Sequence, residues 1–160
     1  MTVCDTSRVR SAVLVLLLAA VLAPVAAAAT QFGRGTATIT TRTGKVVLRV
    51  ELARSPAERQ TGLMGRGSLA ARAGMVFLYP HGATGGFWMK DTTIPLDIAF
   101  SDAGGRILRI FHMAPCKREP CVIYDPGVAY RAALEVNAGS FRRWNVRRGD
   151  RIAVRATPAR

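Results

Sequence analysis

The chain has 160 residues, of which 49% are hydrophobic, and a formal net charge of +13 at pH 7. This length fits one domain, and no repeat, low-complexity linker or second hydrophobic block divides the chain after its N-terminal segment. The positive charge affects solubility and the encounter with anionic partners, but it does not define a fold or a site. Composition therefore excludes a chain of several domains and leaves the functional class to the motifs.

Residues 1–29 have the pattern of a secretory signal peptide. Two arginines precede an apolar run over residues 12–22, and a string of small residues follows. The run is shorter than the about 20 residues that a membrane helix needs, and a retained N-terminal anchor is the alternative interpretation. We therefore expect cleavage close to Ala28 or Ala29, and export to the periplasm or the cell exterior. Residues 30–160 would then form a single β-rich domain.

Alternation of apolar and polar residues predicts a series of short strands. Residues 36–41 and 45–52 alternate on either side of a turn at residues 42–44, which predicts a β-hairpin. A turn at residues 102–105 predicts a second hairpin. Further strands are expected at residues 74–79, 87–90, 94–101, 106–113, 128–136 and 151–156.

A helix start interrupts these strands. Ser55 stands at the N-cap, Pro56 at the first helical position and Glu58 at the third, which together form a capping box. We expect this helix to continue to about residue 64 and to end at Gly65. Ser140 is expected to cap a second, short helical turn.

Several short strands around one helix predict a mainly β (α+β) fold. We expect a compact antiparallel β-sandwich or open barrel, with one short helix packed on it.

Two cysteines, Cys116 and Cys121, follow the leader. In an oxidising compartment they most simply pair, and closing so short a loop contributes about 2 kcal/mol of stability. Metal binding is the alternative, because His112 and Met113 place further soft ligands nearby. No second pair of Cys or His residues completes a tetrahedral set, so we expect a disulfide and no metal ion.

The segment GFWMKDTTIPLDIAF, residues 86–100, is the most informative stretch, because it places a tryptophan and two carboxylates close together. Trp88 offers a large face and one hydrogen-bond donor, and arginines near the helix end can meet a carboxylate or a sugar hydroxyl. We expect a ligand-binding cleft formed by Arg59, Arg66, Trp88, Lys90 and Asp97. In the alternative interpretation the roles are structural, with Trp88 as a core aromatic and Arg59 bridging to Asp97.

Enzyme motifs are scarce. No G-x-S-x-G motif is present, and the two histidines lack an evident Ser or Cys partner. Asp91 and Asp97 suit the acid and base of a cell-envelope hydrolase, although a turn at Asp91 and hydrogen bonding by Asp97 explain them more simply. Met64, Met75 and Met89 are expected in the core rather than as thioether ligands. We expect noncatalytic binding without a cofactor, with the hydrolase as the alternative.

Five ordered blocks of the sequence carry a resemblance to a known family. They are the helix motif at residues 58–66, residues 74–77, residues 87–97, the cysteine region at 115–124, and residues 134–139 with 149–150. Together they closely resemble domain of unknown function 192 (DUF192) of bacteria and archaea, over about residues 36–156. The resemblance implies a compact, mainly β domain that is often exported, in a family with no established activity.

Export and charge limit the classes of partner. A basic surface favours anionic lipid headgroups, surface polysaccharides or acidic ligands, and a solvated basic face without a specific partner is the alternative. Nucleic acid is not expected, because an exported protein rarely meets it and the basic residues do not interleave with aromatic ones. We expect a small anionic or saccharide ligand, or an anionic envelope surface, and no transmembrane segment after removal of the signal.

Overall fold

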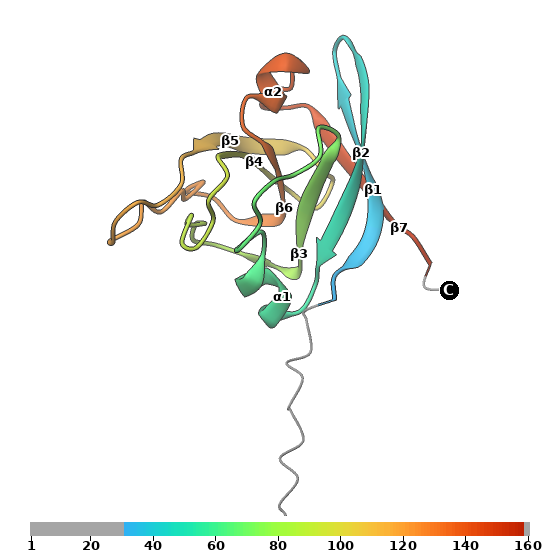
Figure 1. The fold of residues 1–160 in the computed structure, drawn as a ribbon. Helices are drawn as coiled ribbons and strands as arrows, with labels where there is room; N and C mark the ends of the chain where they lie inside the picture. The colour runs from blue at the N-terminus through green and yellow to red at the C-terminus, as the bar shows by residue number, and fades with distance from the viewer. Residues whose placement is uncertain (1–30, 159–160) are drawn as a thin grey trace, which may run out of the picture.

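Within residues 31–158, which the computed structural model describes, seven strands form one mixed sheet (Figure 1). The strands are β1 (Gly33–Thr41), β2 (Gly44–Ala53), β3 (Ala73–Ala83), β4 (Leu96–Ser101), β5 (Ile107–Met113), β6 (Tyr130–Asn137) and β7 (Arg151–Ala156). Two short helices, α1 (Pro56–Thr61) and α2 (Ser140–Arg143), lie between strands. The predicted mainly β fold class is confirmed, whereas the expected signal peptide lies outside the described residues.

The strands lie in the order β5-β4-β6-β3-β2-β1-β7. Both expected hairpins, β1 with β2 and β4 with β5, are present and antiparallel. The pair β2 and β3 is parallel, which differs from the expected all-antiparallel arrangement. Parallel neighbours need a crossover connection, and α1 with the turns after it supplies one.

The two edge strands approach each other at one corner of the sheet. Arg106 and Arg151 form an isolated antiparallel bridge, and the amide of Ile107 donates to the carbonyl of Asp150 at 2.8 Å. In Figure 1, β4 and β5 cross the direction of β1 and β2, so the sheet is strongly twisted. The sheet is curled but not closed into a barrel.

Each face of the curled sheet carries its own core. Alternate residues of a strand point to opposite faces, so Leu134 of β6 packs in one cluster and Ala133 in the other. The first cluster includes Phe141 of α2. The second includes Met75 and Met89, which confirms that these two methionines are core residues. This second core forms the floor of the candidate site.

The capping box at the start of α1 is confirmed, since the Ser55 hydroxyl accepts from the amide of Glu58. The helix ends at Thr61 rather than near Gly65, because Gly62 takes a φ of 46° that leaves the helix. The start of α2 also differs from expectation. Gly139 is the N-cap there, and the buried Ser140 hydroxyl accepts from Arg143 instead of capping the turn.

Residues 87–90 do not form the expected strand. Only one isolated bridge, between Phe87 and Tyr124, is found there. The segment has a strand-like alternation of side chains because Phe87 and Met89 point inward, but its backbone pairs with a loop instead of the sheet.

Candidate functional site

Trp88 lies at the surface between two inward-pointing neighbours. Its relative exposure is 48%, so the alternative of a core aromatic is wrong. Phe87 packs edge-on against Phe77 and Phe100, with ring centroids 4.9 Å and 5.4 Å away. The inward ring of Phe87 therefore anchors the segment while the indole of Trp88 faces solvent.

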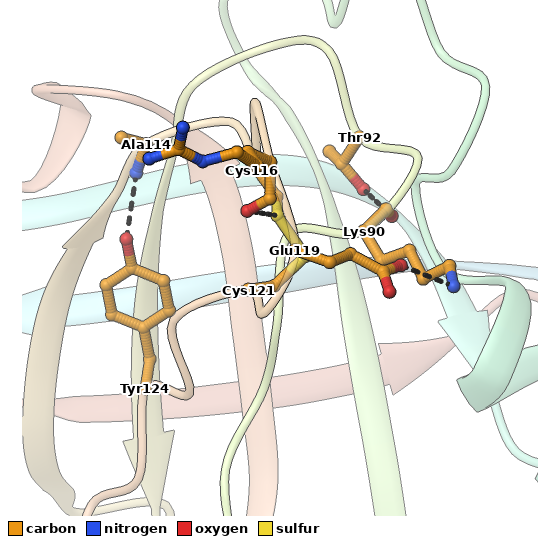
Figure 2. Close-up of a disulfide and its surroundings, with 8 residues drawn as sticks. Lys90, Thr92, Ala114, Cys116, Glu119, Cys121 and Tyr124 are labelled. Carbon is orange, nitrogen blue, oxygen red and sulfur yellow. Dashed lines mark hydrogen bonds and ion pairs between the residues drawn. A yellow bond between two sulfur atoms is a disulfide. The ribbon is translucent and has the colours of Figure 1, made fainter.

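The loop that contains the cysteines lies beside the segment that carries Trp88, and Figure 2 shows Glu119 of this loop paired with Lys90. Cys116 and Cys121 form the predicted disulfide. The amide of Cys116 donates to the carbonyl of Met89 at 3.4 Å, and the backbones of Phe87 and Tyr124 exchange hydrogen bonds of 3.2 and 2.8 Å. The disulfide thus closes the loop whose backbone fixes residues 87–89.

Lys90 links Trp88 to the same loop. Its ammonium lies 5.8 Å from the centroid of the Trp88 ring and 2.7 Å from a carboxylate oxygen of Glu119, as Figure 2 shows for the ion pair. The hydrogen bond and the charge of Glu119 raise the pKa of Lys90, and Lys90 lowers the pKa of Glu119. Both side chains are solvent-exposed, so the ion pair contributes little to stability. The ammonium of Lys90 is within cation–π distance of the indole.

Glu135 is a buried carboxyl that the sequence prediction missed. It lies in β6 opposite Met75 of β3 and Ile98 of β4, in the second core, and is 4% exposed. Burial alone raises its pKa to about 8, because no described residue supplies a charge or hydrogen bond that favours the carboxylate. The side chain is therefore neutral at pH 7 and can donate a hydrogen bond.

A small pocket connects the Glu135 carboxyl to the surface beside Trp88. Its walls come from α1, the turn after it, β3 and the segment that carries Trp88, and they include Arg59, Gly62, Phe77, Trp88, Thr92 and Glu135. The cavity volume is about 40 Å³. A cavity of this volume has room for a small polar group such as a hydroxyl group.

Arg59 forms one side of this pocket and is held in place by its neighbours. Its guanidinium lies 4.8 Å from the centroid of the Tyr79 ring and donates to the carbonyl of Leu78 at 3.1 Å. It also donates to the carbonyl of Arg54. Arg59 therefore does not bridge to Asp97, and the structural role that the alternative interpretation gave it is wrong.

The other three expected site residues lie outside this pocket. Arg66 pairs with Glu51 at 2.5 Å, and Lys90 pairs with Glu119. Asp97 accepts from His112 and from the backbone amide of α2. The structure thus brings Arg59 and Trp88 together and separates them from Arg66 and Asp97.

The two carboxylates of the hydrolase alternative do not face a common cavity. Asp91 is exposed in a turn with φ 53° and lines a shallow hollow beside the disulfide. Asp97 lines a groove next to α2. Among residues 31–158, three or more His, Cys, Asp or Glu side chains nowhere gather in a way that would hold a metal ion.

A family model matches residues 37–154, which is most of the chain, and it is described as an uncharacterised ACR, DUF192. The chain belongs to the DUF192 family. Four of the five sequence blocks that resemble this family contribute residues to the pocket over Glu135. No curated protein matches the chain.

Two solved structures are similar to this DUF192 chain. One, a "putative transcription regulator" from Sinorhizobium meliloti 1021, has a TM-score of 0.72 and 32% identity and covers 79% of this chain and 97% of its own. The other is a protein of unknown function from Novosphingobium aromaticivorans DSM 12444, with a TM-score of 0.71 and 33% identity. The match covers 83% of this chain and 94% of that protein. The structural relatives therefore support the family and the fold.

Proposed function

We propose that this DUF192 protein is an exported, noncatalytic binding protein, and that the pocket over Glu135 receives one hydroxyl group of a saccharide-like ligand. The observation that carries this proposal is the Glu135 carboxyl itself. Glu135 is 4% exposed and burial raises its pKa, so keeping a carboxyl at this position costs desolvation energy. The carboxyl lines a pocket, and a bound hydroxyl group that exchanges hydrogen bonds with it would offset this cost.

The pocket and its rim suit a sugar ring better than a purely apolar ligand. The exposed face of Trp88 offers a surface on which the apolar side of a sugar ring can lie. Neutral Glu135 both donates and accepts a hydrogen bond, as a hydroxyl group requires. In this proposal the hydroxyl group enters the pocket and the ring lies outside it, against Trp88 and the Arg59 side.

Export is part of this proposal and is supported by the N-terminal pattern of residues 1–29 and by the disulfide, which persists in oxidising compartments. Within residues 31–158 no helix is both long and apolar enough to cross a membrane. Wall saccharides would be accessible to a protein in that location.

The test is a thermal-shift screen of neutral and acidic mono- and oligosaccharides at low salt, followed by calorimetry on each compound that stabilises the protein. We expect Glu135→Met to raise the melting temperature, because it removes a desolvated carboxyl, and to weaken binding at least tenfold. Trp88→Phe should weaken binding with little change in stability, whereas the matched Trp144→Phe should leave binding intact.

A structural role for these residues predicts the opposite pattern. If no saccharide shifts the wild type, or if Glu135→Met lowers stability and leaves affinity unchanged, the pocket is not the binding site. The hydrolase alternative receives no support from the geometry, since Asp91 and Asp97 line different hollows.

A further inference from the structure

We propose a second binding site, in the groove between β5 and the segment from α2 to β7, that holds the phosphate group of a small organic phosphate ester through His112, Arg142 and Arg147. This groove has a cavity volume of about 720 Å³ and lies beside the edge strand β5. It is independent of the pocket over Glu135. Asp97 of this groove and Glu135 of the pocket belong to neighbouring strands, but they point to opposite faces of the sheet.

The register of β4 and β6 establishes that separation. Asp97 lies opposite Val136, whose side chain packs in the first core with Phe141 of α2. Glu135 lies opposite Ile98, whose side chain packs in the second core. Because successive side chains of a strand alternate between faces, the two carboxyl groups open into different cavities.

A buried carboxylate fixes the orientation of His112. Asp97, with a side chain only 7% exposed, accepts from Nδ1 of His112 at 3.0 Å and from the amide of Phe141 at 3.3 Å. The imidazole is 64% exposed. Since Nδ1 of His112 is hydrogen-bonded to Asp97, Nε2 is the ring nitrogen that remains for a ligand.

Two arginines complete the positive side of the groove. Arg142 and Arg147 both line it, and neither takes part in an ion pair among the described residues. Asp97 is the one acidic residue in the lining, and its oxygens already accept the two hydrogen bonds described above. The guanidinium groups of Arg142 and Arg147 have no ion-pair partner among the described residues, and His112 lines the same groove. Such a set of donors is suited to a phosphate, which accepts from several donors at once.

The other residues that line the groove are mostly apolar, which favours a phosphate ester over inorganic phosphate. Ile110, Phe141 and Val146 contribute apolar surface to the groove. An organic group attached to the phosphate can lie on this surface while the phosphate oxygens meet the donors. Phenyl phosphate, which joins an apolar ring to a phosphate group, is therefore the appropriate probe.

The experiment measures phenyl phosphate and inorganic phosphate binding by calorimetry at pH 7 and low salt. We expect phenyl phosphate to bind more tightly than inorganic phosphate, and the Kd for phenyl phosphate to rise at least tenfold in His112→Ala and in Arg142→Ala/Arg147→Ala. The control Arg72→Ala/Arg155→Ala removes two exposed arginines outside this groove, so it has the same net charge, and its Kd should stay within twofold. Thermal melts verify that each variant is folded.

The proposal is overturned if the wild type does not bind phenyl phosphate at millimolar concentration, or if both double variants lose affinity equally. Vesicles of phosphatidylglycerol separate a soluble ester from a lipid headgroup. We expect both double variants to bind vesicles to the same extent. A vesicle interaction lost only in Arg142→Ala/Arg147→Ala would assign the groove to a membrane surface and contradict the soluble ligand.

Discussion

Glu135 and Asp97 lie one position apart in the register of β4 and β6, so their carboxyl groups point to opposite faces of the sheet and have different surroundings. Asp97 accepts hydrogen bonds from His112 and from the backbone amide of Phe141. Glu135 lies among apolar side chains, and burial raises its pKa to about 8. The first arrangement orients a histidine, whereas the second keeps an acid neutral at the end of a pocket.

The raised pKa of Glu135 predicts a pH-dependent stability. The group has an ordinary pKa of 4.5 in the unfolded chain and about 8 in the folded protein, so the unfolded chain loses its proton first as pH rises. The favourable contribution is complete below pH 4.5 and is lost as pH rises through about 8. The loss is at most about 1.4 kcal/mol per pH unit.

Urea unfolding at several pH values between 5 and 8.5 measures this effect. Glu135→Gln should lack the slope, and the exposed Glu119→Gln should retain it. Parallel pH profiles for the wild type and Glu135→Gln would show that Glu135 titrates normally.

The sequence places Arg59, Arg66, Trp88, Lys90 and Asp97 in one cleft, and a binding role for them stays a prediction. In the structure Arg59 and Trp88 line the same pocket, whereas Arg66 and Asp97 do not. Asp97 was placed in the same cleft, although the pleat of β4 turns it to the other face. Glu135 was missed, yet a glutamate in the apolar run AALEV, in phase with Ala133, is a signal of a buried acid.

At the level of elements, alternation of side chains predicts where a strand such as β7 begins and ends. It does not predict which segment pairs with which, as the parallel pairing of β2 and β3 shows. The bounds of β7 match the prediction, because its alternation and flanking turn are local features. Residues 87–90 alternate equally well but pair with the disulfide loop, a contact that local pattern does not reveal. The parallel pairing of β2 with β3 likewise depends on the path of the crossover through α1.

The turn after α1 has a glycine that contacts the site. A Cβ at Gly62 would come 3.1 Å from the Phe77 ring, and its φ is 46°. Gly65 has a φ of 71° but no atom within 4 Å of its Cβ position. Both Gly→Ala substitutions should cost about 1 kcal/mol for the left-handed backbone, and Gly62→Ala should cost more because the Phe77 ring must move. Equal losses in urea unfolding would contradict this packing.

The disulfide loop is predicted to stabilise the segment that carries Trp88. Cys116→Ser/Cys121→Ser should lower the free energy of unfolding by about 2 kcal/mol. It should also increase acrylamide quenching of Trp88 fluorescence, since the backbone bonds from the loop to Phe87 and Met89 loosen. Alkylation without reductant should label no thiol in folded protein lacking residues 1–29. Labelling of Cys116 and Cys121 would refute the pairing.

On the scale of the whole molecule, the curled sheet separates two hollows whose linings differ in chemistry. One face carries the pocket over Glu135 beneath α1, and the other carries the groove beside α2. The net charge of +13 and the few ion pairs among the described residues leave many arginines to attract anions. A single small sheet thereby offers both a hydroxyl-sized pocket and a cationic groove.

Export is tested on the full chain in a bacterial host. The intact mass of the exported protein should correspond to cleavage close to Ala28 or Ala29, because small residues follow the apolar run there. A mature species that retains residues 12–22 would contradict a cleaved signal and favour a retained anchor.

Binding at Trp88 is observed most directly by fluorescence in the Trp144→Phe background, where Trp88 is the remaining tryptophan of the chain. A saccharide that stabilises the protein should change Trp88 emission in a saturable manner, with the Kd found by calorimetry. Addition of Glu135→Met should raise that Kd at least tenfold. Emission that does not respond to any stabilising saccharide, or a Kd unaffected by Glu135→Met, would contradict a binding pocket between Trp88 and Glu135.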